Sequence, residues 1–155
     1  MIIRPEELRG DFVSMNKIIE HDMEVIPADL YVQTHSTNPL LRTETLDLAL
    51  QALLDTKGKY DSVFSVTKYQ TRLWNKEGKP FNHNPQELIR TQDLEPLFEE
   101  NSNFFIFSQE SFRNADNKRI GLKPMMFEQN KLEAVDIDNP EDFELAKALD
   151  LILKR

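Results

Sequence analysis

The sequence contains no cysteine among its 155 residues. This absence excludes disulfide bonds, thiolate metal sites and a cysteine nucleophile, and it agrees with a protein of a reducing cytoplasm. Glycine is also scarce, with only four residues, at positions 10, 58, 78 and 121. None of them forms a GxGxxG or a GxxxxGKS/T pattern, so the sequence carries no glycine-rich loop of the kind that cradles nucleotide phosphates.

Negatively charged residues outnumber positively charged residues. The 19 lysines and arginines stand against 27 aspartates and glutamates, which gives a formal net charge of −8. Because no basic stretch is dense enough to form a nucleic-acid footprint, no nucleic-acid partner is expected. An anionic nucleotide as ligand would require a metal ion or a few well-placed arginines to offset the negative field of the protein.

Long apolar runs are missing as well. No segment approaches the length of a membrane span, and the first residues lack the apolar core of a signal peptide. The sequence therefore predicts a cytoplasmic protein without a membrane partner. With 39% hydrophobic and 30% charged residues, the chain has the composition of a soluble globular protein, and its length suits a single domain over residues 1–155.

The order of apolar, polar and turn residues predicts an α/β fold. Strands are expected at 2–4, 30–33, 61–67, 104–107, 124–127 and 133–137. Since helices are expected between most of them, the pattern favours an α/β sandwich with a mostly parallel sheet. The continuous apolar run at 104–107 is typical of a central strand that is covered on both faces.

Helix ends are marked by capping residues. Asp11 is suited to cap a first helix that ends before Pro27, with Phe12, Met15, Ile19 and Met23 on its inner face. Thr43 is a good N-cap for a second helix, and Gly58 is a natural stop. A helical turn is expected around 110–113. Asn139 as cap and Pro140 at the first helical position predict the last helix.

The sequence pattern of residues 70–82 predicts a segment that projects from the domain. A turn at 76–78 lies between two short extended runs, which favours a hairpin or a long arm. Trp74 and Phe81 on such an arm would be exposed unless a partner covers them, or they would fold back on the domain. Both alternatives are open at this stage, although exposed aromatic residues often mark interfaces.

The segment 30–41 combines a strand, a polar loop and the start of a helix. Ligands of α/β proteins bind outside the carboxyl ends of strands, where Thr37, Asn38 and backbone N–H groups near Pro39 can present donors to an anion or a sugar. His35, at the strand end, is suited to donate to a sugar hydroxyl. The alternative is that this joint is only a structural connection.

Asp136 and Asp138 form the sharpest local pattern. On a strand, residues two apart point to the same face, and paired carboxylates suit a hard cation such as Mg²⁺ that holds substrate phosphates. The alternatives are that both carboxylates are simply solvated or that Asp138 stabilises the N-terminus of the following helix.

Two arginines outside the regular elements, Arg72 and Arg90, could bind a phosphate or a carboxylate, or could be ordinary surface residues. Three scattered histidines without an i, i+4 pair argue against a zinc site. Ser14 and Ser36 have no nucleophile-elbow context, so a hydrolase triad has no support.

Several segments resemble the cytidylyltransferases that make CMP-activated acidic sugars, especially the acylneuraminate cytidylyltransferases. The segments, in chain order, are Arg-Pro-Glu-Glu-Leu at 4–8, His-Ser-Thr-Asn-Pro-Leu at 35–40, Asp-Ser-Val-Phe-Ser-Val-Thr at 61–67, Arg-Leu-Trp at 72–74, Arg-Thr-Gln-Asp-Leu-Glu-Pro at 90–96, Glu-Asn-Ser-Asn-Phe-Phe-Ile-Phe at 100–107, Arg-Ile-Gly at 119–121, Asp-Ile-Asp at 136–138, and Asp142 with Phe143. Their order and spacing agree with the family along nearly the whole chain.

The resemblance implies a three-layer, Rossmann-like nucleotidyltransferase fold and a homodimer. It also implies a Mg²⁺-dependent reaction of CTP with a sialic-type sugar acid, in which the anomeric hydroxyl attacks the α-phosphate and pyrophosphate is released. The excursion at 70–96 corresponds to the arm that reaches toward the partner subunit in this family, which favours an interface role for its aromatic residues.

Roles for individual residues are implied in the same way. The metal-holding aspartates correspond to Asp136 and Asp138, and the catalytic basic residues to Arg72 and Arg90. The substrate-binding residues correspond to Arg4, Ser14, His35, Thr37, Asn38 and Asn101. His35 stands where the family commonly has glutamine, and Leu41 where arginine is frequent, so the resemblance does not define the sugar.

The resemblance begins at about the third strand of the family pattern. The glycine-rich loop that grips the CTP phosphates has no counterpart here, so an N-terminally truncated version of the fold is expected. This departure leaves two main hypotheses, an active cytidylyltransferase or a sugar-binding or dimerisation module that has lost turnover. A glycosyltransferase that uses its Asp-x-Asp pair agrees with the local motif but not with the other segments.

Overall fold

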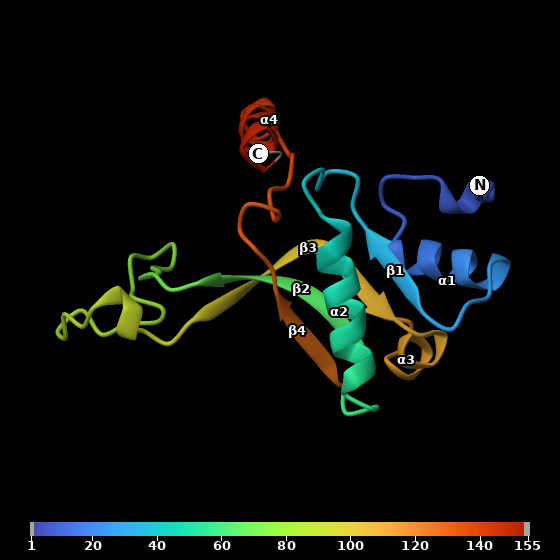
Figure 1. Ribbon diagram of the computed structural model, residues 1–155, viewed down its shortest axis with the longest axis horizontal. Helices are drawn as coiled ribbons and strands as arrows, with labels where there is room; N and C mark the ends of the chain where they lie inside the picture. Colours follow the sequence, from blue (N-terminus) through green and yellow to red (C-terminus); the bar gives the residue numbers. More distant parts are fainter. Residues whose placement is uncertain (1, 154–155) are drawn as a thin grey trace.

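A mixed four-stranded sheet with helices on both faces forms the body of the protein. In the computed structural model, which describes residues 2–153, the sheet holds β1 (Tyr31–Thr34), β2 (Ser62–Tyr69), β3 (Leu97–Phe107) and β4 (Pro124–Glu128) in the spatial order β1-β3-β2-β4 (Figure 1). These strands confirm the predictions at 30–33, 61–67, 104–107 and 124–127.

The prediction of a mostly parallel sheet is wrong. Only β2 and β4 pair in parallel, whereas β3 lies between β1 and β2 and runs antiparallel to both. Parallel neighbours need a crossover, which is commonly a helix. The connection from β2 to β3 contains only the short 3-10 helix η2 (Thr91–Asp93) and brings the chain back beside β2, so β3 has to run in the opposite direction.

Helices cover both faces of the sheet. Helix α2 (Thr43–Asp55) packs on one face, and α1 (Met15–Val25) and the short α3 (Gln109–Asn114) pack on the other (Figure 1). Because side chains alternate along a strand, Phe104 and Ile106 join the cluster with α2, and Phe105 and Phe107 join the cluster with α1 and α3. The prediction that 104–107 is covered on both faces is confirmed.

Two predicted strands are absent from the described residues. Residues 2–4 are irregular and precede the 3-10 helix η1 (Glu6–Leu8); the carbonyl of Arg4 accepts a bond from Arg9 Nε (2.7 Å) instead of a strand partner. Residues 133–137 are also irregular. Their backbone groups bond to side chains and to the loop after β1, which replaces the ladder that a strand would require.

The N-termini of the first two helices are shifted from the predicted caps. A turn closed by Val13 N and Gly10 O (3.1 Å) precedes α1, whose N-cap is Ser14 rather than Asp11. Phe12 is therefore outside the helix and fully exposed, not on its inner face. In α2, Thr43 is the first helical residue and Arg42 is the N-cap.

The end signals of α2 and α4 (Pro140–Leu153) are confirmed. Gly58 has a φ of +86°, a left-handed conformation that follows the last turn of α2. Asn139 Oδ1 accepts bonds from the N–H groups of Glu141 (3.1 Å) and Asp142 (3.2 Å). Asp142 Oδ2 in turn accepts from Asn139 N (3.1 Å), so the two side chains cap α4 reciprocally.

Residues 70–96 project from the sheet as an arm (Figure 1). The carboxyl end of β2 and the start of β3 continue outward as a paired stalk, in which Thr67 lies opposite Glu99 and Tyr69 opposite Leu97. At the distal part, Trp74 pairs with Pro80 in a β-bridge. Trp74 and Phe81 are 55% and 69% exposed, so neither side chain folds back into the core.

None of the helices in the described part of the chain is long and apolar enough to cross a bilayer.

Candidate functional site

The loop after β1 and the segment after β4 meet at the carboxyl ends of these two strands. Asn38 Nδ2 donates to Val135 O (3.3 Å), and Ile137 N donates to Thr37 O (2.9 Å). These bonds place the predicted loop residues Thr37 and Asn38 directly beside the segment that carries both predicted metal-binding aspartates. Two regions almost 100 positions apart in the sequence therefore form one site, where α/β folds bind ligands.

The side chain of Asn38 is buried and supports this site from the interior of the protein. The residue is only 4% exposed, and its side-chain bond from Nδ2 ties the β1 loop to Val135. Its Oδ1 is buried without a hydrogen-bond partner among the described residues. Asn38 thus holds the 135–138 segment in place.

The two aspartates differ in their surroundings. The carboxylate of Asp136 is half-buried, and its Oδ1 is inaccessible to solvent and has no hydrogen-bond partner in the described chain. Asp138 is exposed; its backbone N–H donates to Asp142 Oδ2 (3.1 Å). Because the segment is irregular, the argument that both side chains share one face of a strand does not apply.

The pair fits a hard cation with few protein ligands. Residues 2–153 contain no group of three or more His, Cys, Asp or Glu side chains placed to hold a metal ion. Mg²⁺ is commonly bound by one or two carboxylates and completes its shell with water and substrate phosphates. A buried carboxylate oxygen without a partner is costly unless a cation or donor meets it, and Asp136 Oδ1 is such an atom.

A buried amide network supports the segment from behind. Asn103 Nδ2 donates to Gln129 Oε1 (2.9 Å) and to the carbonyl of Glu133 (2.8 Å). The Glu133 carboxylate accepts from Thr45 Oγ1 (2.6 Å) and from Arg42 N (3.4 Å). The strand β3, the end of β4 and the start of α2 are joined to the aspartate segment through these four contacts.

The same network fills a bulge in β3. Between Phe64 and Val66 the register with β3 shifts, and Ser102 there adopts a left-handed φ of +55°. Asn101, which the family resemblance assigns to the substrate, lies 9% exposed in this bulge. Its Oδ1 accepts from Ser65 Oγ (2.5 Å), and its Nδ2 donates to Thr67 Oγ1 (2.9 Å). The structure therefore places Asn101 in the interior support of the site.

A cleft of about 400 Å³ opens between α1 and the sheet. It is lined in part by Arg4, His35 and Thr37, three of the predicted substrate-binding residues. Arg4 also approaches Asp22 (3.6 Å). Ser14, the fourth, borders an adjoining cleft of about 380 Å³ together with Arg119. The structure thus gathers these residues on the α1 side of the sheet.

Arg119 was not predicted as a site residue. Its guanidinium lies 3.7 Å from the ring centroid of Phe105, and Nη1 donates to Gln33 Oε1 (3.0 Å) and contacts His35 Nε2 (3.5 Å). Burial lowers the pKa of Arg119 below its ordinary value, and the nearby charge of Glu100 acts in the opposite direction. Arg119 belongs to the Arg-Ile-Gly segment at 119–121 that resembles the family, but the sequence could not show its role, because its neighbours come from separate strands.

The predicted catalytic arginines lie on the arm. Arg72 Nη2 donates to the carbonyl of Ile89, and Arg90 forms a paired contact with Asp93 through Nε (2.8 Å) and Nη2 (3.0 Å). The arm extends outward from the carboxyl end of β2, and both arginines lie along it rather than at its base (Figure 1). Within this chain the structure does not bring Arg72 and Arg90 together with Asp136 and Asp138.

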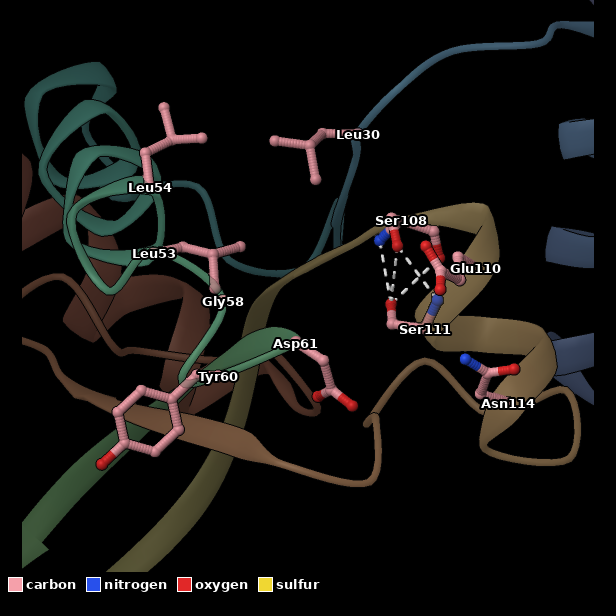
Figure 2. A pocket seen from close by; sticks show the side chains of 10 residues that line it. All are labelled: Leu30, Leu53, Leu54, Gly58, Tyr60, Asp61, Ser108, Glu110, Ser111 and Asn114. Atoms are coloured by element: carbon pink, nitrogen blue, oxygen red, sulfur yellow. Dashed lines mark hydrogen bonds between the residues drawn. The ribbon is translucent and has the colours of Figure 1, made fainter.

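A further cleft lies at the opposite end of β2, beside α2 and α3 (Figure 2). The polar side chains of Asp61, Ser108 and Ser111 in this cleft are engaged in structural bonds. The Asp61 carboxylate accepts from the N–H groups of Leu122 (2.9 Å) and Lys123 (3.1 Å), and Ser108 and Ser111 cap α3 reciprocally. A Cβ at Gly121 would overlap this carboxylate, so a larger residue there would displace the Asp61 side chain from its bonds. This cleft is therefore not the candidate site.

Comparisons with known proteins agree with these features. A model of the cytidylyltransferase family matches residues 1–154. N-acylneuraminate cytidylyltransferase A of Danio rerio is 28% identical over 150 residues, which cover 92% of this chain and 34% of that protein. This chain thus spans about a third of the length of that curated relative.

A solved structure, CMP:2-keto-3-deoxy-manno-octonic acid synthetase complexed with CTP, has a similar fold. The TM-score is 0.57 with 11% sequence identity, and the match covers 94% of this chain and 70% of that chain. At this low identity the similarity concerns the fold alone.

Proposed function

Because this chain belongs to the cytidylyltransferase family, we propose that it transfers CMP from CTP to a sialic-type sugar acid in a Mg²⁺-dependent reaction. The observation that carries the proposal is the unpartnered Oδ1 of Asp136, held directly beside the loop of Thr37 and Asn38. One position at the carboxyl ends of β1 and β4 thus offers both a cation ligand and a polar loop for a second substrate.

In the proposed reaction, the anomeric hydroxyl oxygen of the sugar forms a bond to the α-phosphorus of CTP. The bond from that phosphorus to the bridging oxygen breaks, and pyrophosphate leaves. Asp136 and Asp138 would hold Mg²⁺, which, when bound, neutralises charge on the phosphates and fixes their position. Asn38 and Asn103 keep this segment in place through Val135 and Glu133.

His35 and Thr37 are the residues proposed to contact the sugar. Gln33 Nε2 (3.3 Å) and Arg119 Nη1 (3.5 Å) both contact His35 Nε2, and both are donors. His35 Nε2 is therefore the acceptor, and its ring proton resides on Nδ1. That N–H is left to donate to a sugar hydroxyl in the cleft that His35 and Thr37 line.

A pyrophosphate-release assay tests the proposal. The purified chain is mixed with CTP, MgCl₂ and N-acetylneuraminate, and inorganic pyrophosphate is measured over time, with omission of each component as the controls. Release that requires all three components is the expected result. A folded chain that releases no pyrophosphate contradicts the proposed transfer and leaves the binding-module hypothesis.

We also propose that the arm contacts a second copy of the chain. Trp74 and Phe81 are large aromatic side chains that remain exposed near the end of the paired stalk, and such residues often dominate protein interfaces. In a dimer, the arm would carry Arg72 and Arg90 toward the partner, which agrees with their distance from the aspartates of their own chain.

Sedimentation velocity tests the arm proposal. The chain is expected to sediment as a dimer at micromolar concentrations, and Trp74→Asp is expected to weaken the dimer by at least about 30-fold, which corresponds to about 2 kcal/mol. Leu48→Asp, at a leucine that is 65% exposed on α2, is the matched control and should leave the dimer intact. A wild-type monomer, or equal weakening by both variants, would contradict the proposal.

A further inference from the structure

We propose that Arg119 forms an anion subsite in the cleft beside α1 and there binds the carboxylate of the sugar acid. The identity of the anion rests on the proposed function, whereas the subsite itself rests on the contacts of Arg119. No comparison and no sequence pattern assigned a ligand to this residue. It differs from Arg72 and Arg90, which lie on the arm.

The guanidinium of Arg119 is half-buried and has no carboxylate within ion-pair distance in the described chain. Other arginines have such partners: Arg4 approaches Asp22, Arg42 approaches Glu44, and Arg90 binds Asp93. Glu100 is the nearby negative charge, but it forms no ion pair with Arg119, and partial removal of an arginine from water without a paired carboxylate is unfavourable. In a protein of net charge −8, an unpaired and partly desolvated cation is a strong indication of an anionic ligand.

The orientation of the guanidinium is fixed before any ligand arrives. The fully buried ring of Phe105 supports its face, and Gln33 Oε1 accepts from Nη1. Both N–H groups of Nη1 are then engaged, by Gln33 and by His35, and those of Nε and Nη2 remain for a ligand. The remaining N–H groups can bind a carboxylate through two parallel bonds, the geometry that arginine favours.

Arg119 lies where two clefts adjoin. One, of about 380 Å³, is lined in part by Ser14, Glu100 and Arg119, and the other, of about 400 Å³, holds Arg4, His35 and Thr37. The contact of Arg119 with His35 links them. A sugar acid whose carboxylate binds Arg119 can therefore extend its hydroxyl groups along His35 and Thr37, toward the loop beside Asp136.

The charges around the cleft favour a carboxylate over a phosphate. Glu100 lines the same cleft as Arg119, and its negative charge opposes the entry of a second negative charge. A carboxylate carries one charge, whereas a phosphate group carries up to two at neutral pH. The planar carboxylate also matches the in-plane fork of N–H groups of a guanidinium whose face lies over Phe105.

Isothermal titration of the intact chain tests the subsite without CTP or Mg²⁺. The probes are N-acetylneuraminate and its methyl ester, which keeps the sugar but lacks the negative charge. Arg119→Met keeps the bulk over Phe105 and removes the cation. Arg113→Met, at an exposed arginine on α3, is the matched control. Two-dimensional NMR spectra check that each variant retains the fold.

We expect the wild type to prefer the acid to the ester. Arg119→Met should weaken acid binding by about tenfold or more and abolish the preference, because it removes a charge-assisted bond. Arg113→Met should change neither, and Arg119→Lys should retain a reduced preference for the acid. If Arg119→Met does not fold, the lysine variant decides: an undiminished affinity for the acid would overturn the proposal.

Three other results would overturn the subsite proposal. They are no binding of the acid by the wild type, equal affinity of the wild type for acid and ester, or a preference for the acid over the ester that persists in Arg119→Met. A pyrophosphate-release assay distinguishes failure of the subsite proposal from failure of the proposed function. Release that continues in Arg119→Met with an unchanged KM for the acid rejects the subsite alone. Selective acid binding without release supports the subsite and rejects the transfer reaction.

Discussion

Asn103→Ala is expected to lower the free energy of unfolding by about 2–4 kcal/mol. Asn103 is fully buried, and its Nδ2 bonds to Gln129 Oε1 and to Glu133 O. Alanine leaves both acceptors buried without this donor and opens a gap in the bulge of β3. The Oδ1 of Asn103 already lacks a partner, so its removal offsets part of the loss.

Chemical denaturation measures this effect, with the slope of the transition compared between variants. Asn114→Ala is the matched control, because Asn114 is exposed on α3. The control should change stability by no more than about 0.5 kcal/mol. A loss below about 1 kcal/mol in Asn103→Ala would show that the network does not support the fold as the contacts indicate.

Asp136→Asn is expected to reduce Mg²⁺-dependent pyrophosphate release by about 100-fold or more, since loss of a charged ligand weakens the hold on the metal. Without Mg²⁺, the same change should leave the stability unaltered or raise it. The reason is that the buried Oδ1 of Asp136 has no partner, and an uncharged amide is less costly to bury.

Two measurements check this prediction separately. Titration of CTP in the presence of MgCl₂ should show weaker binding by Asp136→Asn, and thermal unfolding in the presence of EDTA should show equal or greater stability. Asp29→Asn, at an exposed carboxylate before β1, is the control and should alter neither. Equal CTP affinity of the wild type and Asp136→Asn in MgCl₂ would exclude Asp136 as a ligand.

The parts of the fold that sequence analysis predicted well are those with a local cause. Helix α2 has apolar residues at helical spacing, and α4 begins at an Asn-Pro pair whose cap the structure confirms. The run 104–107 has apolar side chains on both faces and lies in the sheet centre as expected. Each of these signals lies within one short segment.

The parts that it missed depend on contacts between distant segments. Residues 97–103 are mostly polar and show no strand pattern, yet they extend β3, because the returning arm places them beside β2. Residues 133–137 look like a strand but bond to Asn38, Asn103 and Thr37 instead. Arg119 depends on Phe105, Gln33 and His35, which only the folded sheet brings together.

Within the candidate site, the sequence located the aspartate pair and the loop after β1 but could not show that they touch. It also assigned Asn101 to the substrate, whereas the structure uses this side chain to bind Ser65 and Thr67 inside the bulge. A buried polar residue and a ligand-binding polar residue look alike in a single sequence, since burial is decided by the register of β3.

The central position of β3 also has a kinetic consequence. β1 has no other strand neighbour in the described chain, and β2 meets β3 only after the whole arm, residues 70–96, has been synthesised and has looped back. Closing such long loops loses chain entropy before any contact compensates for it. We therefore expect the docking of β3 to be the slow step of folding, before which the apolar side chains at 104–107 remain exposed to intermolecular association.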